Sequence, residues 1–231
     1  MLAVRAVLLD IEGTSTPSSF IQGVLLPVAH DALADWTARI DLPEVVDVLA
    51  ETRRMVPDQP ELSTLRHWSE RGLQIAPLQR LQGMIWEQGY ADGALRGQVY
   101  ADVAPHLRAW AGQGIRVYTF SSGSIQAQRL VFGHSVDGDL SPLIAGFFDT
   151  RIGAKRDPDT YVRLAIGMNL PTLSVAFLSD VEAELDAATT AGMQACHIVR
   201  PDAGAAPSDR HPVAASFGEA ARRLGLPGAG A

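Results

Sequence analysis

The sequence is poor in cysteine, in basic residues and in long apolar runs, and each shortage narrows the classes of protein that it can encode. Its one cysteine, Cys196, excludes an intramolecular disulfide and a cysteine-rich zinc site, and it favours a reducing compartment. The 19 Lys and Arg are outnumbered by 26 Asp and Glu, which gives a formal charge of −7. This balance argues against nucleic acid and anionic membranes as partners. An anionic substrate would therefore need local positive groups or a metal ion.

Apolar runs are short throughout the 231 residues. None reaches the roughly 20 residues of a membrane-spanning helix. The first run ends at Asp10 and is too short for the apolar region and cleavage site of a secretory signal. We therefore expect a cytoplasmic protein. The length suits one large domain, or a core domain with a modest insertion.

Four short segments, rich in β-branched or aromatic residues and with little alternation, have the composition of strands covered on both faces. They are residues 4–10, 115–121, 174–180 and 195–199. Helical patterns separate the strands at residues 102–114, 157–169 and 181–193. This order predicts an α/β fold with a doubly wound, mainly parallel sheet.

One long region interrupts that order. Residues 20–96 contain no convincing strand, only helical patterns such as residues 43–56 and 76–89. We therefore expect a catalytic core formed by residues 1–19 and 97–231, with residues 20–96 inserted as an α-helical cap domain.

Polar residues that could take part in catalysis or ligand binding follow three of the predicted strands. An open α/β sheet binds its ligands at these strand ends. They are Asp10 and Glu12, Ser121 and Ser122, and Asp180, with Lys155 in a loop between the second and third strands. Converging carboxylates repel one another unless a hard divalent cation lies among them, and oxygen ligands with waters suit Mg²⁺. The pattern indicates a phosphate site.

At such a site, one carboxylate can attack phosphorus in line and form an aspartyl-phosphate. A second acid must then protonate the leaving oxygen and later deprotonate the attacking water. Glu12, two residues beyond Asp10, is the natural candidate for this second acid.

The motifs "DIEGT", "SSGS", the lysine of "GAK" and "LSDVEAELDAA" resemble the four ordered motifs of the haloacid dehalogenase superfamily. Most phosphatases of that superfamily have a second aspartate where this chain has Glu12. The stretches "DIEGTSTP", "VYADVAP", "SSGSIQAQRLVFGHS", "GFFDTRIGAKRDPDTY" and "FLSDVEAEL" resemble the acireductone synthases, the bifunctional enolase-phosphatases of methionine salvage. The resemblance implies a Rossmann-like core of the haloacid dehalogenase type.

It further implies a monomer with one Mg²⁺ per chain that enolises 2,3-diketo-5-methylthiopentyl-1-phosphate and then removes its phosphate, leaving 1,2-dihydroxy-3-keto-5-methylthiopentene. Asp10 would be the nucleophile and a metal ligand, Glu12 the acid/base group and a metal ligand through its carbonyl, and Asp180 the second carboxylate ligand. The remaining implied roles are substrate binding by Ser121, Ser122, Gly123 and Lys155, with Lys155 also steadying Asp10.

Several alternatives stay open at this point. A phosphatase for another small phosphorylated metabolite has the same core motifs. A receiver-type phosphoacceptor module also gathers acids, a hydroxyl, a lysine and Mg²⁺, although it needs no helical insertion. The enolisation base could be Glu12 or Lys155, and Glu184 could either contact the metal through water or simply begin a helix.

Overall fold

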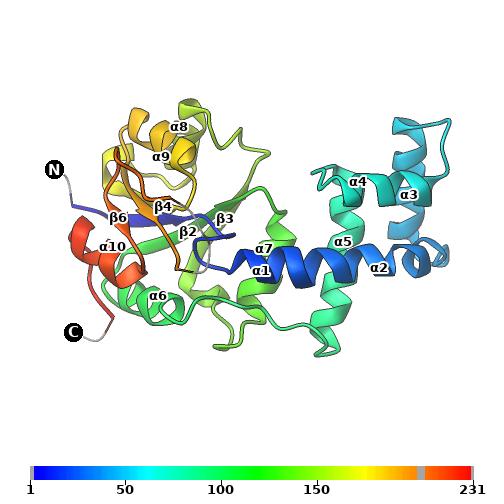
Figure 1. Cartoon of the computed structure of the whole chain (residues 1–231), viewed down its shortest axis with the longest axis horizontal. Helices are drawn as coiled ribbons and strands as arrows, with labels where there is room; N and C mark the ends of the chain where they lie inside the picture. Colours follow the sequence, from blue (N-terminus) through cyan, green and yellow to red (C-terminus); the bar gives the residue numbers. More distant parts are fainter. Residues whose placement is uncertain (1–2, 202–205, 230–231) are drawn as a thin grey trace. The chain divides into compact units, whose positions relative to one another are not determined.

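The computed structural model describes residues 3–201 and 206–229. The chain divides into two compact units, Met1–Ser18 with Gly97–Ala231, and Ser19–Arg96. The first unit contains a sheet in the order β3-β2-β1-β4-β5-β6, in which every pairing is parallel (Figure 1). The predicted doubly wound, mainly parallel sheet is therefore confirmed.

Four of the strands correspond to the four predicted from sequence, and two were missed. The strands are β1 (Ala6–Leu9), β2 (Arg116–Ser121), β3 (Ile144–Asp149), β4 (Val175–Ser179), β5 (Gln194–Ile198) and β6 (Val213–Ala214). The missed strands, β3 and β6, lie at the two edges of the sheet. β3 is only partly buried, and Gly146 interrupts its apolar residues, while β6 has only two residues.

Helices cover both faces of this sheet (Figure 1). On one face lie α6, α7 and α10, with Trp110 and Phe217 stacked at 5.6 Å between centroids; on the other lie α8 and α9. Successive residues of β1 point alternately into these two cores, which is why its apolar run is unbroken. The helices are α6 (Val103–Gly112), α7 (Ile125–Gly133), α8 (Pro158–Gly167), α9 (Glu182–Thr190) and α10 (Phe217–Leu224), with short 3₁₀ turns η2 (Ser141–Leu143) and η3 (Thr172–Ser174).

The second unit, Ser19–Arg96, is helical. The chain enters it through α1 (Ser18–Phe20), the π-helical stretch η1 (Ile21–Leu25) and α2 (Leu26–Thr37), and continues through α3 (Pro43–Met55), α4 (Glu61–Glu70) and α5 (Ala76–Ala91). Proline in the first turn of α3 and of α5 suits a position where no backbone N–H is needed. Trp86 of α5 donates its indole N–H to the carbonyl of Leu25 at 2.8 Å, which ties α5 to η1.

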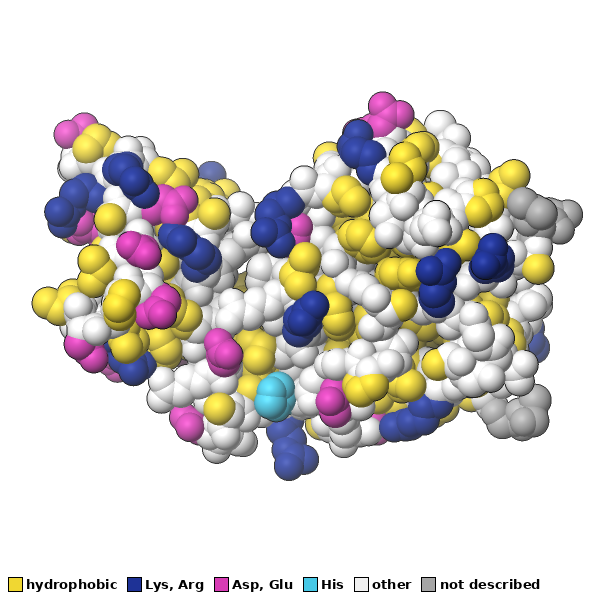
Figure 2. Space-filling view, turned by 180° about the vertical axis from the view of Figure 1, so that it is seen from behind, with side chains coloured by type: hydrophobic (Ala, Val, Ile, Leu, Met, Phe, Trp, Pro, Cys, Tyr) yellow, Lys and Arg dark blue, Asp and Glu magenta, His cyan; other side chains and the backbone are white. Residues whose placement is uncertain are grey.

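Two surface properties of the described residues bear on partners. No helix among them is both long and apolar enough to cross a bilayer. On the face seen in Figure 2, basic and acidic side chains of the described residues are interspersed, so neither sign forms a broad patch there.

The strand order fixes where a ligand can bind. The chain winds outward from β1 in one direction through β2 and β3, and in the other through β4 and β5. The carboxyl ends of β1 and β4 therefore flank the topological switch point, where open α/β sheets form their ligand crevice. Asp10 follows β1 and Asp180 follows β4 at this point.

Candidate active site

Asp10 lies at the open end of β1 with only 4% of its surface exposed. Its backbone N–H donates to the carbonyl of Leu178 at 2.9 Å, which continues the pairing with β4. Its carboxylate oxygen Oδ1 accepts the N–H of Ile11 at 2.8 Å, and Oδ2 accepts a longer hydrogen bond from Ser179 at 3.4 Å. The strand thus holds a buried carboxylate in one orientation.

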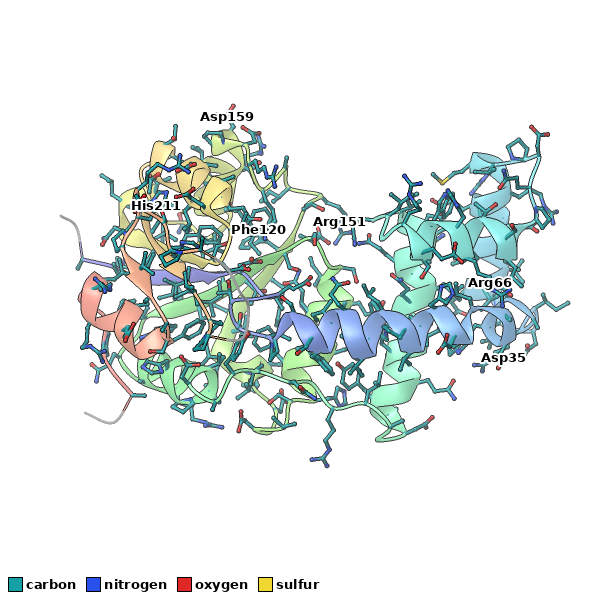
Figure 3. The ribbon with its side chains drawn as sticks, viewed as in Figure 1. Asp35, Arg66, Phe120, Arg151, Asp159 and His211 are labelled. Atoms are coloured by element: carbon teal, nitrogen blue, oxygen red, sulfur yellow. The ribbon has the colours of Figure 1, made fainter. Side chains whose placement is uncertain are left out.

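Lys155 is the cation that faces this carboxylate. Its Nζ donates to Asp10 Oδ1 at 2.7 Å and lies 2.8 Å from Glu184 Oε2. The backbone carbonyl of Lys155 accepts the hydroxyl of Tyr161 at 2.7 Å, and the ammonium lies 5.7 Å from the centroid of Phe120, labelled in Figure 3. Burial opposes the charge, but the two carboxylates outweigh it and raise the pKa of Lys155 above its usual value. Lys155 is therefore a fixed positive charge.

Glu184, whose role the sequence left open, is a buried partner of that lysine. It lies in the first turn of α9 with 6% of its surface exposed, and its Oε2 also accepts the hydroxyl of Ser179 at 3.1 Å. Burial, and then the negative charge of Asp10, raise the pKa of Glu184 to about 7, against the opposing pull of Lys155. Lys155 is therefore held between the carboxylate of Asp10, which follows β1, and that of Glu184, which lies in α9.

Asp180 is oriented by a threonine from the loop after β1. Thr14 donates its hydroxyl to Asp180 Oδ1 at 3.2 Å, and the same hydroxyl accepts the Asp180 N–H at 2.9 Å. Burial and the charge of Asp10 raise the pKa of Asp180 to about 6. Asp10 and Asp180 are thus two acids close enough to repel each other.

Gly13 is needed where this loop passes Asp180. Its φ is +75°, a conformation that side chains rarely adopt, and a Cβ there would lie 2.2 Å from Asp180 Oδ2. We expect Gly13→Ala to lower the free energy of unfolding by about 2 kcal/mol or more, because it adds steric overlap to the backbone strain. Urea unfolding would measure the loss.

Gly114→Ala is the matched control. Gly114 also has φ +75°, but a Cβ there would meet no atom within 4 Å. Only the backbone cost of about 1 kcal/mol is expected in this variant. Equal losses in the two alanine variants would contradict the close approach of Gly13 to Asp180.

Ser121, Ser122 and Gly123 connect β2 to α7. The hydroxyl of Ser121 accepts the N–H of Gly123 at 3.1 Å. Gln128, which the sequence did not single out, fixes this turn: its amide donates to the carbonyl of Gly123 at 2.9 Å, and its oxygen accepts the hydroxyl of Thr119 at 2.6 Å. Since the turn leads into the N-terminus of a nine-residue helix, its amides suit a phosphate group.

The hydrogen bonds and charge interactions of the site bring together Asp10, Lys155 and Asp180. Glu12 follows on the loop after β1, where its backbone pairs with Thr16 and its side chain is half-buried. The Ser121–Gly123 turn lies at the end of β2, the strand beside β1. All of the residues predicted for the site therefore lie at the carboxyl edge of one sheet.

The oxygen atoms available at this site suit a hard divalent cation. Among the described residues, no group of three or more His, Cys, Asp or Glu side chains is arranged to hold a metal. Two carboxylates do face each other, since the charge of the buried Asp10 adds to burial in raising the pKa of the half-buried Asp180. A cation between them would relieve this repulsion, and oxygen ligands completed by backbone carbonyl and water are typical of Mg²⁺.

A parallel α/β fold with two acids and a lysine at the switch point of the sheet is typical of enzymes that transfer or hydrolyse phosphoryl groups. The family model for haloacid dehalogenase-like hydrolases matches residues 4–192. The chain is 45% identical to enolase-phosphatase E1 of Gluconacetobacter diazotrophicus, over 97% of this chain and 96% of the relative. It is 48% identical to enolase-phosphatase E1 of Parvibaculum lavamentivorans, over 87% and 88% of the two chains.

A solved structure agrees with these relatives. The UTR4 protein of Saccharomyces cerevisiae superposes with a TM-score of 0.80 at 29% identity, covering 93% of this chain and 98% of that one. The chain belongs to the enolase-phosphatase E1 family of haloacid dehalogenase-like hydrolases. The resemblance predicted from sequence is thereby confirmed, and the receiver-type alternative is set aside.

Proposed function

We propose that this enzyme enolises 2,3-diketo-5-methylthiopentyl-1-phosphate and then hydrolyses the enol phosphate to 1,2-dihydroxy-3-keto-5-methylthiopentene, as a step of methionine salvage. Membership of the enolase-phosphatase E1 family carries the proposal. The pairing of Asp10 with Lys155 supplies a nucleophile and a phosphate-binding cation at one strand end. We also propose that the enzyme acts as a monomer, as the family resemblance implies. We also propose a cytoplasmic location, which the single cysteine favours.

In the hydrolytic step, a carboxylate oxygen of Asp10 attacks phosphorus, and the bond from phosphorus to the substrate oxygen breaks. Glu12 gives its proton to that leaving oxygen and later takes one from the water that attacks the aspartyl-phosphate. The second attack breaks the bond between phosphorus and Asp10, which restores the carboxylate and releases inorganic phosphate. Lys155 and the Ser121–Gly123 turn would hold the phosphoryl oxygens throughout.

Asp10, Asp180 and the carbonyl of Glu12 would hold one Mg²⁺. When bound, this ion would supply positive charge to the phosphoryl oxygens. Lys155 adds a second positive charge beside Asp10, and its raised pKa keeps that charge in place at neutral pH.

Enolisation takes a proton from a carbon next to a carbonyl and returns a proton to the carbonyl oxygen. Lys155 is poorly suited to remove the first proton, because its raised pKa leaves it protonated. Glu12 is a half-buried acid on the loop beside Asp10, and its side chain is one methylene longer than the aspartate common in related phosphatases. We therefore propose Glu12 as the base.

The test gives purified protein the diketone phosphate with Mg²⁺, follows the enol and acireductone by ultraviolet absorbance, and assays phosphate in the same sample. We expect the enol to appear first and phosphate to follow it. Phosphate release from generic esters without turnover of the diketone would instead support a phosphatase for another small metabolite.

Substitutions of Glu12 separate the two activities. We expect Glu12→Gln to lower both enolisation and phosphate release by roughly 10²- to 10⁴-fold, because both need a carboxyl group that can gain and lose a proton. Glu12→Asp should keep most of the phosphatase activity but lose enolisation, since its carboxylate lies one methylene short. Single-turnover absorbance traces would resolve the two steps. Intact enolisation in Glu12→Gln would transfer the role of base to another group.

The helical unit Ser19–Arg96 has a proposed role of its own. We propose that residues 20–96 serve as the cap domain that selects the substrate, as the family resemblance implies. The core domain, residues 1–19 and 97–231, would then supply all of the groups that handle phosphate.

A further inference from the structure

Arg200, two residues beyond the end of β5, is almost fully buried, with 4% of its surface exposed. Its Nε and Nη2 both donate to the backbone carbonyl of Thr14, at 3.0 and 2.8 Å. Its Nη1 donates to both carboxylate oxygens of Asp102, at 2.9 Å each. A buried guanidinium is costly unless it is paired, and here one side chain joins the loop after β1 to the start of α6.

The surroundings allow this guanidinium little freedom. Its central carbon lies 4.1 Å from the ring centroid of Tyr100 and 5.0 Å from that of Phe217. Asp102 is itself fixed, because it also accepts the backbone N–H of Phe217 at 2.6 Å. Arginine suits this position because its planar fork stacks on rings and donates in two directions at once, which a lysine cannot reproduce.

Thr14 links the arginine to the proposed metal site. The carbonyl of Thr14 receives the two hydrogen bonds from Arg200, while its hydroxyl makes both hydrogen bonds to Asp180. Thr14 is fully buried, so these partners replace water on its carbonyl and on its hydroxyl. A shift of the Thr14 peptide would therefore rotate the hydroxyl that orients the Asp180 carboxylate.

We propose that Arg200 is a positioning residue for the active site: through Thr14 it holds the Asp180 carboxylate in the orientation that faces Asp10. The proposal rests on the proposed function, in which these two carboxylates bind Mg²⁺. Arg200 touches neither carboxylate itself, so its effect must pass through the Thr14 peptide.

The test measures Mg²⁺ binding by calorimetry, without substrate, in the wild type and in Arg200→Lys. Lysine keeps the positive charge but cannot make the paired hydrogen bonds to Thr14 together with those to Asp102. We expect the dissociation constant for Mg²⁺ to rise about tenfold, the loss typical of an outer partner of a metal ligand. Thr14→Val should raise it similarly, whereas Thr14→Ser, which keeps the hydroxyl, should bind Mg²⁺ nearly as the wild type does.

A double substitution tests the route of the effect. If Arg200 acts through Thr14, Arg200→Lys adds little to the loss already present in Thr14→Val, so the two changes are not additive. Independent, additive losses would overturn the proposed route. Should Arg200→Lys fail to fold, Asp102→Asn loosens the guanidinium from its other side and is expected to weaken Mg²⁺ binding in the same direction.

Trp110→Phe is the matched control, because Trp110 packs on Phe217 in the same core but makes none of the hydrogen bonds of Arg200. It should lower stability and leave Mg²⁺ binding unchanged. Unchanged Mg²⁺ affinity in folded Arg200→Lys, or an equal loss in Trp110→Phe, would overturn the positioning role. Absence of Mg²⁺ binding in the wild type would instead overturn the metal site of the proposed function.

Discussion

Asp10→Asn is expected to abolish phosphate release, with a loss on the order of 10⁴- to 10⁶-fold in kcat. The amide cannot attack phosphorus, and it also withdraws one of the two carboxylates proposed for Mg²⁺. The fold should persist, because asparagine is nearly isosteric and its carbonyl oxygen can still accept the hydrogen bonds from Ile11 and Lys155. Phosphate assays with the diketone phosphate, alongside circular dichroism, would measure both properties.

Asp149→Asn supplies the control for this change. Asp149 is also a buried aspartate at the carboxyl end of a strand, with 8% of its surface exposed, but it pairs with Arg151 at the end of β3. The Asp149→Asn variant should release phosphate at nearly the wild-type rate. Measurable turnover by Asp10→Asn at more than a trace level would contradict the aspartyl-phosphate mechanism.

Lys155→Met is the second change with a large expected effect. It should lower phosphate release on the order of 10³-fold, because a buried positive charge that faces the transferred phosphoryl group is lost. It should also lower the free energy of unfolding by roughly 3 kcal/mol in the absence of metal, since it leaves the buried carboxylates of Asp10 and Glu184 without their cation. Urea unfolding in a chelator, with parallel phosphate assays, would measure the two losses.

The double variant Lys155→Met with Glu184→Gln separates stability from catalysis. Neutral glutamine removes one of the two unpaired charges, so part of the lost stability should return while activity stays low. Restoration of activity in the double variant would show that Lys155 serves only to neutralise Glu184. An unchanged stability in Lys155→Met would contradict the buried ion pairs themselves.

The central strands could be predicted from sequence because both of their faces are buried, so composition alone identifies them. Residues 4–10, 115–121 and 174–180 contain β1, β2 and β4, and residues 195–199 overlap β5. The edge strand β3 was missed because Gly146 interrupts its apolar residues and because the strand is only partly buried. Its position depends on pairing with β2, which is a tertiary property.

The residues of the candidate site also divide into those that the sequence indicates and those that only the folded structure reveals. Asp10, Lys155 and Asp180 could be proposed from sequence because each lies in a short motif of its own, "DIEGT", "GAK" or "LSDVEAELDAA". Arg200 and Thr14 could not, since their contact joins residues 186 positions apart and neither has a distinctive neighbourhood in sequence. The sequence left the role of Glu184 open, because an acid in the first turn of a helix is common for structural reasons alone. Its contact with Lys155 is a tertiary contact that the sequence does not show.

The long span of these contacts has a consequence for biosynthesis. Asp10 emerges from the ribosome 145 residues before Lys155, and Thr14 emerges 186 residues before Arg200. Lys155 follows β3 and Arg200 follows β5, and these strands pair only after most of the chain has been made, because non-local parallel pairings form late. Nascent chains and their fragments therefore hold the acids without the cations that orient them. Phosphatase activity should arise at the end of synthesis in a single event, with no active precursor that could hydrolyse cellular phosphate esters prematurely.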